Sequence, residues 1–268
     1  MQLHIRHETV YSYKKPVKHS VQNLRLTPRR DPWQRALNWQ IIAPGRRHMQ
    51  VDAYGNVVHL LTLDQPHHEI RIVVQGVVET QDEQRTPFPD EGPLSPLAYL
   101  AETSLTRADG PLRQFAADSL STDGNRLDAL LALSSAICKT VTYEKGATQV
   151  YDSAGQAFAR GRGVCQDHAH IFVACSRSRG IPARYVSGYL YAGEDSDVAS
   201  HAWADAWLGP NLGWTSIDVT NRARTDGRHC RLAVGRDYLD ACPVRGVRRG
   251  GADEQMSVSV NVSESAQQ

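Results

Sequence analysis

The 268-residue chain lacks the features that mark several specialised classes of protein. Its five cysteines are too few, and odd in number, for a small disulfide-stabilised scaffold. Its formal net charge is only +1, so no overall field draws it toward nucleic acid or a membrane surface. No run approaches the ~18 apolar residues of a membrane span, and the first residues lack the apolar stretch of a signal peptide. We therefore expect a soluble, cytoplasmic protein whose thiols stay reduced.

The first part of the chain carries the signals of an antiparallel β-domain. Apolar and polar residues alternate over short stretches separated by turn residues, a pattern typical of a β-sandwich. We predict this domain over residues 1–80, followed by a linker at 81–96 that is polar and rich in proline. The expected strands cover 3–7, 9–13, 21–26, 37–42, 50–53, 57–63 and 70–78, with a turn at Lys15-Pro16.

The second part, residues 97–268, combines two periodicities. Apolar residues recur with the helical period before residue 180 and alternate after it, which indicates an α+β domain with helices packed on an antiparallel sheet. Residues 256–262 alternate like an edge strand with one buried face, and the basic segment 245–251 is expected to be a solvated loop. The other expected elements are helices at 97–102, 112–120, 126–139 and 164–179 and strands at 183–191, 201–208 and 213–219.

One cysteine differs from the other four by its position. Cys165 follows Gly161-Arg162-Gly163-Val164 and lies at the start of the predicted helix 164–179. Backbone N–H groups in the first turn of a helix lack intrahelical partners and carry partial positive charge, which stabilises a thiolate. The glycines allow a sharp turn and a close approach of a substrate carbonyl to the backbone. Cys165 is therefore a candidate nucleophile, whereas the other cysteines are expected to be packing or loop residues.

A histidine and an aspartate follow on a predicted hairpin. His201 lies on a strictly alternating strand, which is followed by the turn 209–212 and by a strand that contains Asp218. With a four-residue turn His201 faces Thr220, and Asp218 lies on the same face one diagonal step away, ~7–8 Å at the backbone. An odd turn without a bulge would put the two side chains on opposite faces. A His201–Asp218 hydrogen bond therefore requires an even turn or a compensating bulge.

Cys165, His201 and Asp218 together fit the catalytic triad of an acyl-transfer enzyme. His201 would take or share the thiol proton, and Asp218 would fix the imidazole tautomer and stabilise its charged form. The oxyanion needs at least two donors, of which the backbone N–H of Cys165 is the first. Tyr143 is a candidate for the second donor. No cofactor is expected.

Seven motifs point to one resemblance. They are Gly161-Arg162-Gly163-Val164-Cys165-Gln166-Asp167-His168-Ala169-His170, the segment from Gly180 to Tyr189, Ser200-His201-Ala202-Trp203 and the segment from Trp214 to Asn221 in the second part, and His7-x-Thr9-x-Tyr11-x-Tyr13, Leu24-Arg25-Leu26-x-Pro28 and Asp52-x-Tyr54-Gly55-Asn56 in the first. The second part resembles the bacterial transglutaminase-like cysteine enzymes, and the first resembles the β-domain that often precedes that core. The resemblance implies a papain-like core with catalytic Cys165, His201 and Asp218. Val219 and His168 depart from the proline and the aromatic residue that are usual at their positions.

The acceptor of the acyl group stays open at this point. A thioester formed from a peptide amide or a glutamine side chain is resolved by water in hydrolysis and by an amine in transamidation. We favour hydrolysis over cross-linking, because nothing in the sequence has the oxygen spacing of a calcium site. Asp195 and Asp197 are expected in a solvated loop or a lid. The expected partner is a peptide or protein substrate, and the oligomeric state is left open.

Other interpretations compete with this one. A zinc site at Cys165, His168 and His170 is disfavoured, because on a helix His170 points ~140° away from Cys165 and no second ligand pair has zinc spacing. No metal is therefore expected, and His168 is predicted to be a partly buried helix residue. A non-catalytic binding scaffold on the same core is the alternative function. Three tryptophans either line a cleft or pack in the core, namely Trp203, Trp207 and Trp214.

Overall fold

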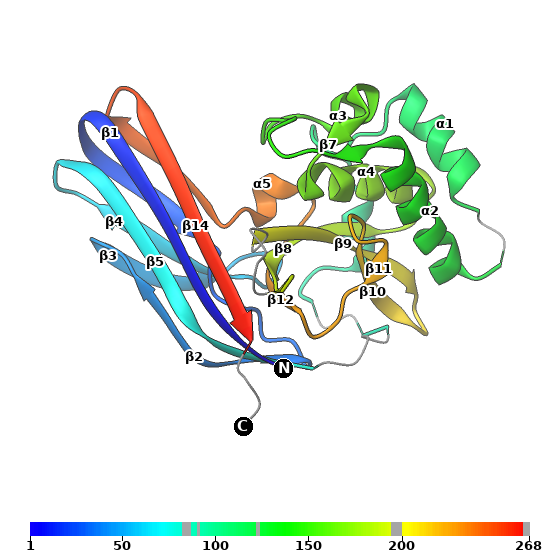
Figure 1. Ribbon diagram of the computed structural model, residues 1–268, viewed down its shortest axis with the longest axis horizontal. Helices are drawn as coiled ribbons and strands as arrows, with labels where there is room; N and C mark the ends of the chain where they lie inside the picture. Colours follow the sequence, from blue (N-terminus) through cyan, green and yellow to red (C-terminus); the bar gives the residue numbers. More distant parts are fainter. Residues whose placement is uncertain (82–86, 90–91, 122–123, 194–199, 265–268) are drawn as a thin grey trace.

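The computed structural model describes the chain except for residues 82–86, 90–91, 122–123, 194–199 and 265–268. Much of the predicted linker, as well as Asp195 and Asp197, therefore lies outside the described residues. Among the residues described, no helix is both long and apolar enough to cross a membrane. Figure 1 shows a curled antiparallel sheet on one side and a helix-covered sheet on the other, as the predicted β-domain and α+β core require.

The curled sheet is built around one long strand, β1 (Gln2–Leu24). The first half of β1 pairs with β5 and β14, and its second half pairs with β4 and β13. The predicted turn at Lys15-Pro16 is instead an irregularity within β1, where the register shifts between Ser12 and Val17. Proline has no N–H to offer the ladder, so pairing is interrupted there while the strand continues. The other strands are β2 (Gln34–Ile42), β3 (Arg46–Val51), β4 (Val57–Leu63), β5 (His67–Thr80), β13 (Val244–Gly250) and β14 (Glu254–Glu264).

The end of the chain returns to the N-terminal sheet. We expected residues 97–268 to form the second part, but β13 and β14 run antiparallel to β1 along almost its whole length. The prediction of a loop at 245–251 is wrong, because most of that segment is β13. Its residues are exposed on both faces, so no alternation of apolar residues marked it as a strand. The sheet therefore combines strands from both ends of the chain.

The core packs helices on a five-stranded antiparallel sheet of order β11-β10-β9-β8-β12. Helix α4 (Cys165–Ser178) is buried along nearly all of its length and contacts β8 and β9. Around it lie η1 (Pro96–Leu100), α1 (Gly110–Ser119), α2 (Arg126–Thr140), α3 (Ala154–Arg160) and α5 (Tyr238–Ala241). The strands are β6 (Thr142–Tyr143), β7 (Arg162–Gly163), β8 (Ala183–Leu190), β9 (Ser200–Gly209), β10 (Gly213–Asp218), β11 (Ala223–Arg224) and β12 (His229–Gly235).

A turn of the N-terminal sheet docks on β12, the edge strand of the core sheet. The fully buried side chain of Asn56 donates from Nδ2 to the carbonyl of Val234 at 2.8 Å, and its Oδ1 accepts from the N–H of Val234 at 2.9 Å. The amide thus pairs with β12 as a neighbouring strand would. Tyr54 in the same turn donates to Asp240 at 2.6 Å. These contacts fix the sheet against the core.

Candidate active site

The first turn of α4 presents Cys165. Val164 is the residue before the helix, and Asp167 accepts its backbone N–H at 2.7 Å and the hydroxyl of Thr148 at 2.6 Å. The carboxylate therefore fixes where the helix begins. Cys165 is partly exposed and sits where unpaired backbone N–H groups and the helix dipole favour an anion.

Each of the two glycines before Cys165 is required by the local structure for a different reason. Gly161 ends α3 in the left-handed region with φ +69°, which glycine adopts without strain. At Gly163 a Cβ would lie 2.6 Å from Oδ2 of Asp167. The sharp turn expected at Gly161 is present. The close approach at Gly163 is that of the Asp167 carboxylate, so this glycine is needed to seat the residue that fixes α4.

His201 on β9 and Asp218 at the end of β10 meet as the hairpin analysis required. Nε2 of His201 donates to Oδ2 of Asp218 at 2.8 Å, and both side chains are buried. The turn is odd, because Gly209 pairs with Gly213, but the register then shifts between Gly213 and Trp214. Trp214 consequently pairs with Trp207, the register predicted for a four-residue turn. The compensating bulge puts His201 and Asp218 on one face.

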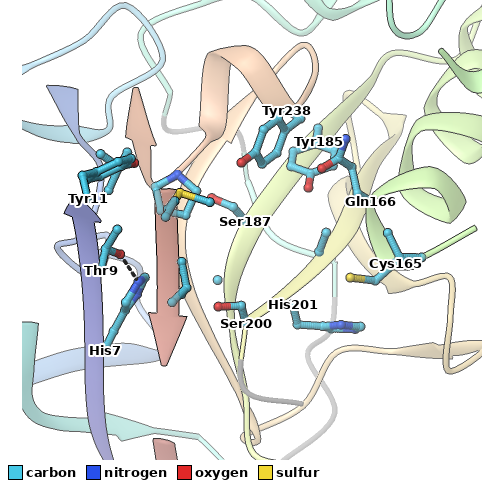
Figure 2. Close-up of a pocket in the computed structure, with 17 residues that line it drawn as sticks. His7, Thr9, Tyr11, Cys165, Gln166, Tyr185, Ser187, Ser200, His201 and Tyr238 are labelled. Carbon is cyan, nitrogen blue, oxygen red and sulfur yellow. Dashed lines mark hydrogen bonds between the residues drawn. The ribbon is translucent and has the colours of Figure 1, made fainter. Parts of the chain in front are cut away.

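The protonation of this pair follows from its contacts. Burial by itself would lower the pKa of His201, but hydrogen bonds to Asp218 and Cys165 raise it to about 10. Burial would likewise raise the pKa of Asp218, but hydrogen bonds from His201 and His229 hold it far below its ordinary value. Nδ1 of His201 makes no hydrogen bond to a protein nitrogen or oxygen. Figure 2 shows His201 and Cys165 side by side in the pocket wall.

A second histidine, His229 on β12, was missed by sequence reasoning. Its Nε2 lies 3.0 Å from Oδ2 of Asp218, on the same oxygen that His201 contacts. Asn221 adds a backbone N–H to Oδ1 at 3.1 Å and its side-chain amide to Oδ2 at 2.7 Å. Asp218 is therefore held by donors from three segments. All seven residues of β12 are buried, so the sequence shows no alternation that would predict this strand.

Asp205, which shares a face of β9 with His201, has a different role. Its two carboxylate oxygens accept from the guanidinium of Arg231 at 2.7 and 2.9 Å, and Arg184 donates at 2.8 Å. Two buried cations hold the pKa of Asp205 below its ordinary value in spite of its burial. Asp205 thus neutralises buried arginines, and Asp218 is the carboxylate that orients His201.

Cys165 and His201 line a pocket of about 260 Å³ between the core and the curled sheet (Figure 2). The core contributes Cys165, His201 and the two tyrosines Tyr185 and Tyr238. The tryptophans are not among the described residues that line it, and the core-packing interpretation applies to them. Trp203 and Trp214 are fully buried, and Trp207 packs on Trp214 with ring centroids 5.3 Å apart.

The two helix histidines of the disfavoured zinc site make protein hydrogen bonds instead. Both ring nitrogens of His168 are engaged, Nε2 with the carbonyl of Val141 and Nδ1 with the hydroxyl of Thr220, each at 3.0 Å. His168 is fully buried rather than partly buried as predicted. His170 accepts the backbone N–H of Tyr238 at 3.0 Å, and burial lowers its pKa to about 3. Both nitrogens of His168 and Nε2 of His170 are thus engaged by protein partners other than Cys165.

Among the described residues, His201, Asp218 and His229 place three potential metal-ligand atoms within 4.8 Å of one another. Both Nε2 atoms are already hydrogen-bonded to the same oxygen of Asp218. These two hydrogen bonds explain why the three side chains lie together. In each imidazole, the nitrogen that a metal would bind is the one that contacts the carboxylate.

The other four cysteines differ from Cys165 in their surroundings. Burial raises the pKa of Cys138, the pKa of Cys175 to about 12 and that of Cys242 to about 11. Cys230 is fully buried in β12. Raised pKa values and burial make a thiol inert. Cys165 is thus the cysteine that opens onto the pocket.

Comparisons with known proteins agree with this architecture. Residues 3–79 match the bacterial transglutaminase-like N-terminal region, and residues 113–219 match the transglutaminase-like superfamily. An uncharacterised protein of Mycobacterium leprae is 31% identical over 280 residues, covering 97% of this chain and 98% of its own. One from Mycobacterium tuberculosis is 30% identical over 96% of this chain and 91% of its own length. The chain belongs to the transglutaminase-like family of proteins with this N-terminal region.

A solved structure shares the whole fold. A candidate cysteine protease from Cytophaga hutchinsonii superposes with a TM-score of 0.78 and 21% sequence identity, covering 100% of this chain and 92% of that protein. The match extends over the curled sheet as well as the core. The combination of the two parts is therefore a feature of the fold itself.

Proposed function

We propose that the protein is a cysteine-dependent acyl-transfer enzyme that acts on a peptide amide or a glutamine side-chain amide. The observation that carries this proposal is the orientation of the buried His201. Its Nε2 donates to Asp218, and its Nδ1 makes no hydrogen bond to a protein nitrogen or oxygen and is left for the thiol of Cys165. A base fixed in this tautomer next to a thiol at a helix N-terminus is the arrangement that nucleophilic catalysis needs.

The proposed chemistry starts from the ion pair in which the Cys165 proton already lies on Nδ1 of His201. The thiolate sulfur attacks the amide carbon, the C–S bond forms, and the carbonyl electron pair moves to oxygen. As the C–N bond breaks, His201 gives its proton to the leaving amine, or to ammonia from a glutamine. Water or an amine then attacks the thioester while Nδ1 takes its proton, and the thiolate departs. Asp218 stabilises the imidazolium throughout.

The oxyanion would be stabilised by the backbone N–H of Cys165 and a second donor. Tyr143 remains the candidate for that donor. Burial and the negative charge of Cys165 raise the pKa of Tyr143, so its hydroxyl keeps its proton. Tyr143 lies on β6, which pairs with the strand immediately before Cys165. Replacement by phenylalanine tests the assignment through the rate of thioester formation.

We propose hydrolysis as the main fate of the thioester, giving a protease or amidase, with transamidation as the second outcome. The experiment incubates the full chain and a Cys165→Ala control with glutamine-containing peptides, with and without a primary amine, and identifies products by mass. A shortened peptide means proteolysis, a deamidated peptide means amidase activity, and an amine adduct means transamidation. No product from a broad peptide panel would contradict the enzyme proposal and favour the non-catalytic scaffold.

We also propose a reducing, cytoplasmic location. It is supported by the five cysteines, none of which forms a disulfide, because thiols stay reduced in a reducing compartment. Cell fractionation with an antibody against the protein tests this location. Recovery with extracytoplasmic markers would contradict it.

A further inference from the structure

The curled sheet forms one wall of the pocket that contains Cys165. His7, Thr9 and Tyr11 on β1 line it, together with Met256 and Val258 on β14. The register pairs Tyr11 with Met256 and Thr9 with Val258, so these side chains share one face of the sheet. Figure 2 shows labelled residues of β1 opposite Cys165 and His201. The substrate-facing surface is thus assembled from the two ends of the chain and from the core.

Within the described part of the chain, this wall carries no charged side chain and exposes apolar side chains to the pocket. Met256 and Val258 are 60% and 49% exposed, although residues of their kind are usually buried. The described lining residues include no Asp, Glu, Lys or Arg. His7 is neutral at neutral pH, because burial lowers its pKa to about 4. Its ring nitrogens are engaged by the hydroxyls of Tyr189 and Thr9 at 2.8 and 2.9 Å.

The pocket is large enough for a side chain next to the amide that Cys165 attacks. Its volume is about 260 Å³. The amide carbon attacked by Cys165 has to lie in this same pocket. A side chain of the acyl donor can therefore reach the wall while its amide lies at Cys165.

We propose that the sheet wall formed by Tyr11, Met256 and Val258 binds an uncharged aliphatic or aromatic side chain of the acyl donor, next to the amide that Cys165 attacks. This inference rests on the proposed function and adds to it a preference for acyl donors with an apolar side chain. An apolar side chain covers the exposed Met256 and Val258, whereas a charged one loses water without gaining a partner. The N-terminal sheet is in this way a specificity element of the active site.

The test compares alkylation of Cys165 by three probes: iodoacetamide, its N-phenethyl derivative and a derivative with an N-carboxymethyl group. Each rate is divided by the rate of the same probe with free cysteine, and the Cys165 peptide is followed by mass. We expect N-phenethyl iodoacetamide to be favoured over iodoacetamide by roughly tenfold or more, and the carboxymethyl probe to be disfavoured. Met256→Asp and Val258→Asp should each remove most of the phenethyl preference.

Met49→Asp is the matched control, because Met49 is 64% exposed on β3 of the same sheet and does not line the pocket. This variant should keep the wild-type preference. Equal normalised rates for the phenethyl and unsubstituted probes, or an unchanged preference in both Asp variants, would overturn the inference. Failure of the proposed function gives another result: Cys165 would react with iodoacetamide itself no faster than free cysteine below pH 7.

Discussion

Replacing Asn56 by alanine should destabilise the protein by several kcal/mol, because it breaks the pairing between the N-terminal turn and the core sheet. The side chain is fully buried and satisfies both the N–H and the carbonyl of Val234. Each buried backbone group left without a partner costs about 1–3 kcal/mol. The two groups together therefore cost about 2–6 kcal/mol, a large part of the about 5–15 kcal/mol that stabilises a typical domain.

Equilibrium unfolding in urea measures this cost, with tryptophan fluorescence reporting on the core and circular dichroism on the sheet. Asn38→Ala is the matched control, because Asn38 is exposed on β2, and surface changes usually stay within about 0.5 kcal/mol. A loss below 1 kcal/mol for Asn56→Ala would refute the reasoning, since the turn would then add little to the docking of the sheet. Separate transitions for the two probes in the variant would locate the loss at this contact.

Three further predictions concern the histidines and Asp218. Burial lowers the pKa of His7 to about 4, whereas a histidine in the unfolded chain titrates near 6.5. As the pH falls from 6.5 to 4, the unfolded state therefore takes up the proton first, and the free energy of unfolding decreases by roughly 3 kcal/mol. His7→Gln should flatten urea midpoints over that range and His4→Gln, on the exposed face, should not; equal slopes would contradict the assignment. Asp218→Asn should lower kcat/KM by roughly 10²–10⁴-fold and move the alkaline limb of the pH–rate profile to lower pH; an unmoved limb would show that Asp218 does not set the charge of His201. His229→Ala should lower kcat/KM by about tenfold or more, as loss of a partner that orients an active-site group does, and His229→Gln, which keeps a donor, should restore part of it; equal losses in the two variants would argue against positioning through that hydrogen bond.

The local signals in the sequence were sufficient to pair His201 with Asp218, whereas the place of Cys165 beside them was implied by the family resemblance. Alternation around His201 placed it on a strand, and the requirement for an even turn or a bulge anticipated the register shift at Gly213. The helix start at Cys165 followed from the apolar period and the glycines before it. These signals are short-range, and short-range patterns determine secondary structure well.

The partners that come from distant segments could not be predicted in the same way. His229 reaches Asp218 only because β12 lies at the edge of the core sheet beside β8. The wall of β1 and β14 forms only because the last strands pair with the first one. Fully buried strands such as β12 and fully exposed ones such as β13 show no alternation, so neither their existence nor their pairing is encoded in a local pattern.

The central claim is that Cys165 reacts as a thiolate paired with the His201 imidazolium. Its most direct test is the rate of alkylation of Cys165 by iodoacetamide between pH 5 and pH 9, followed by mass on the Cys165 peptide. Hydrogen bonds to Asp218 and Cys165 raise the pKa of His201 to about 10, so its imidazolium is present throughout this range. Because a neighbouring imidazolium favours a thiolate, we predict a rate that falls by much less than tenfold for each unit below pH 8.5. A rate that falls about tenfold for each unit below pH 8.5, as for an ordinary exposed thiol, would contradict the claim.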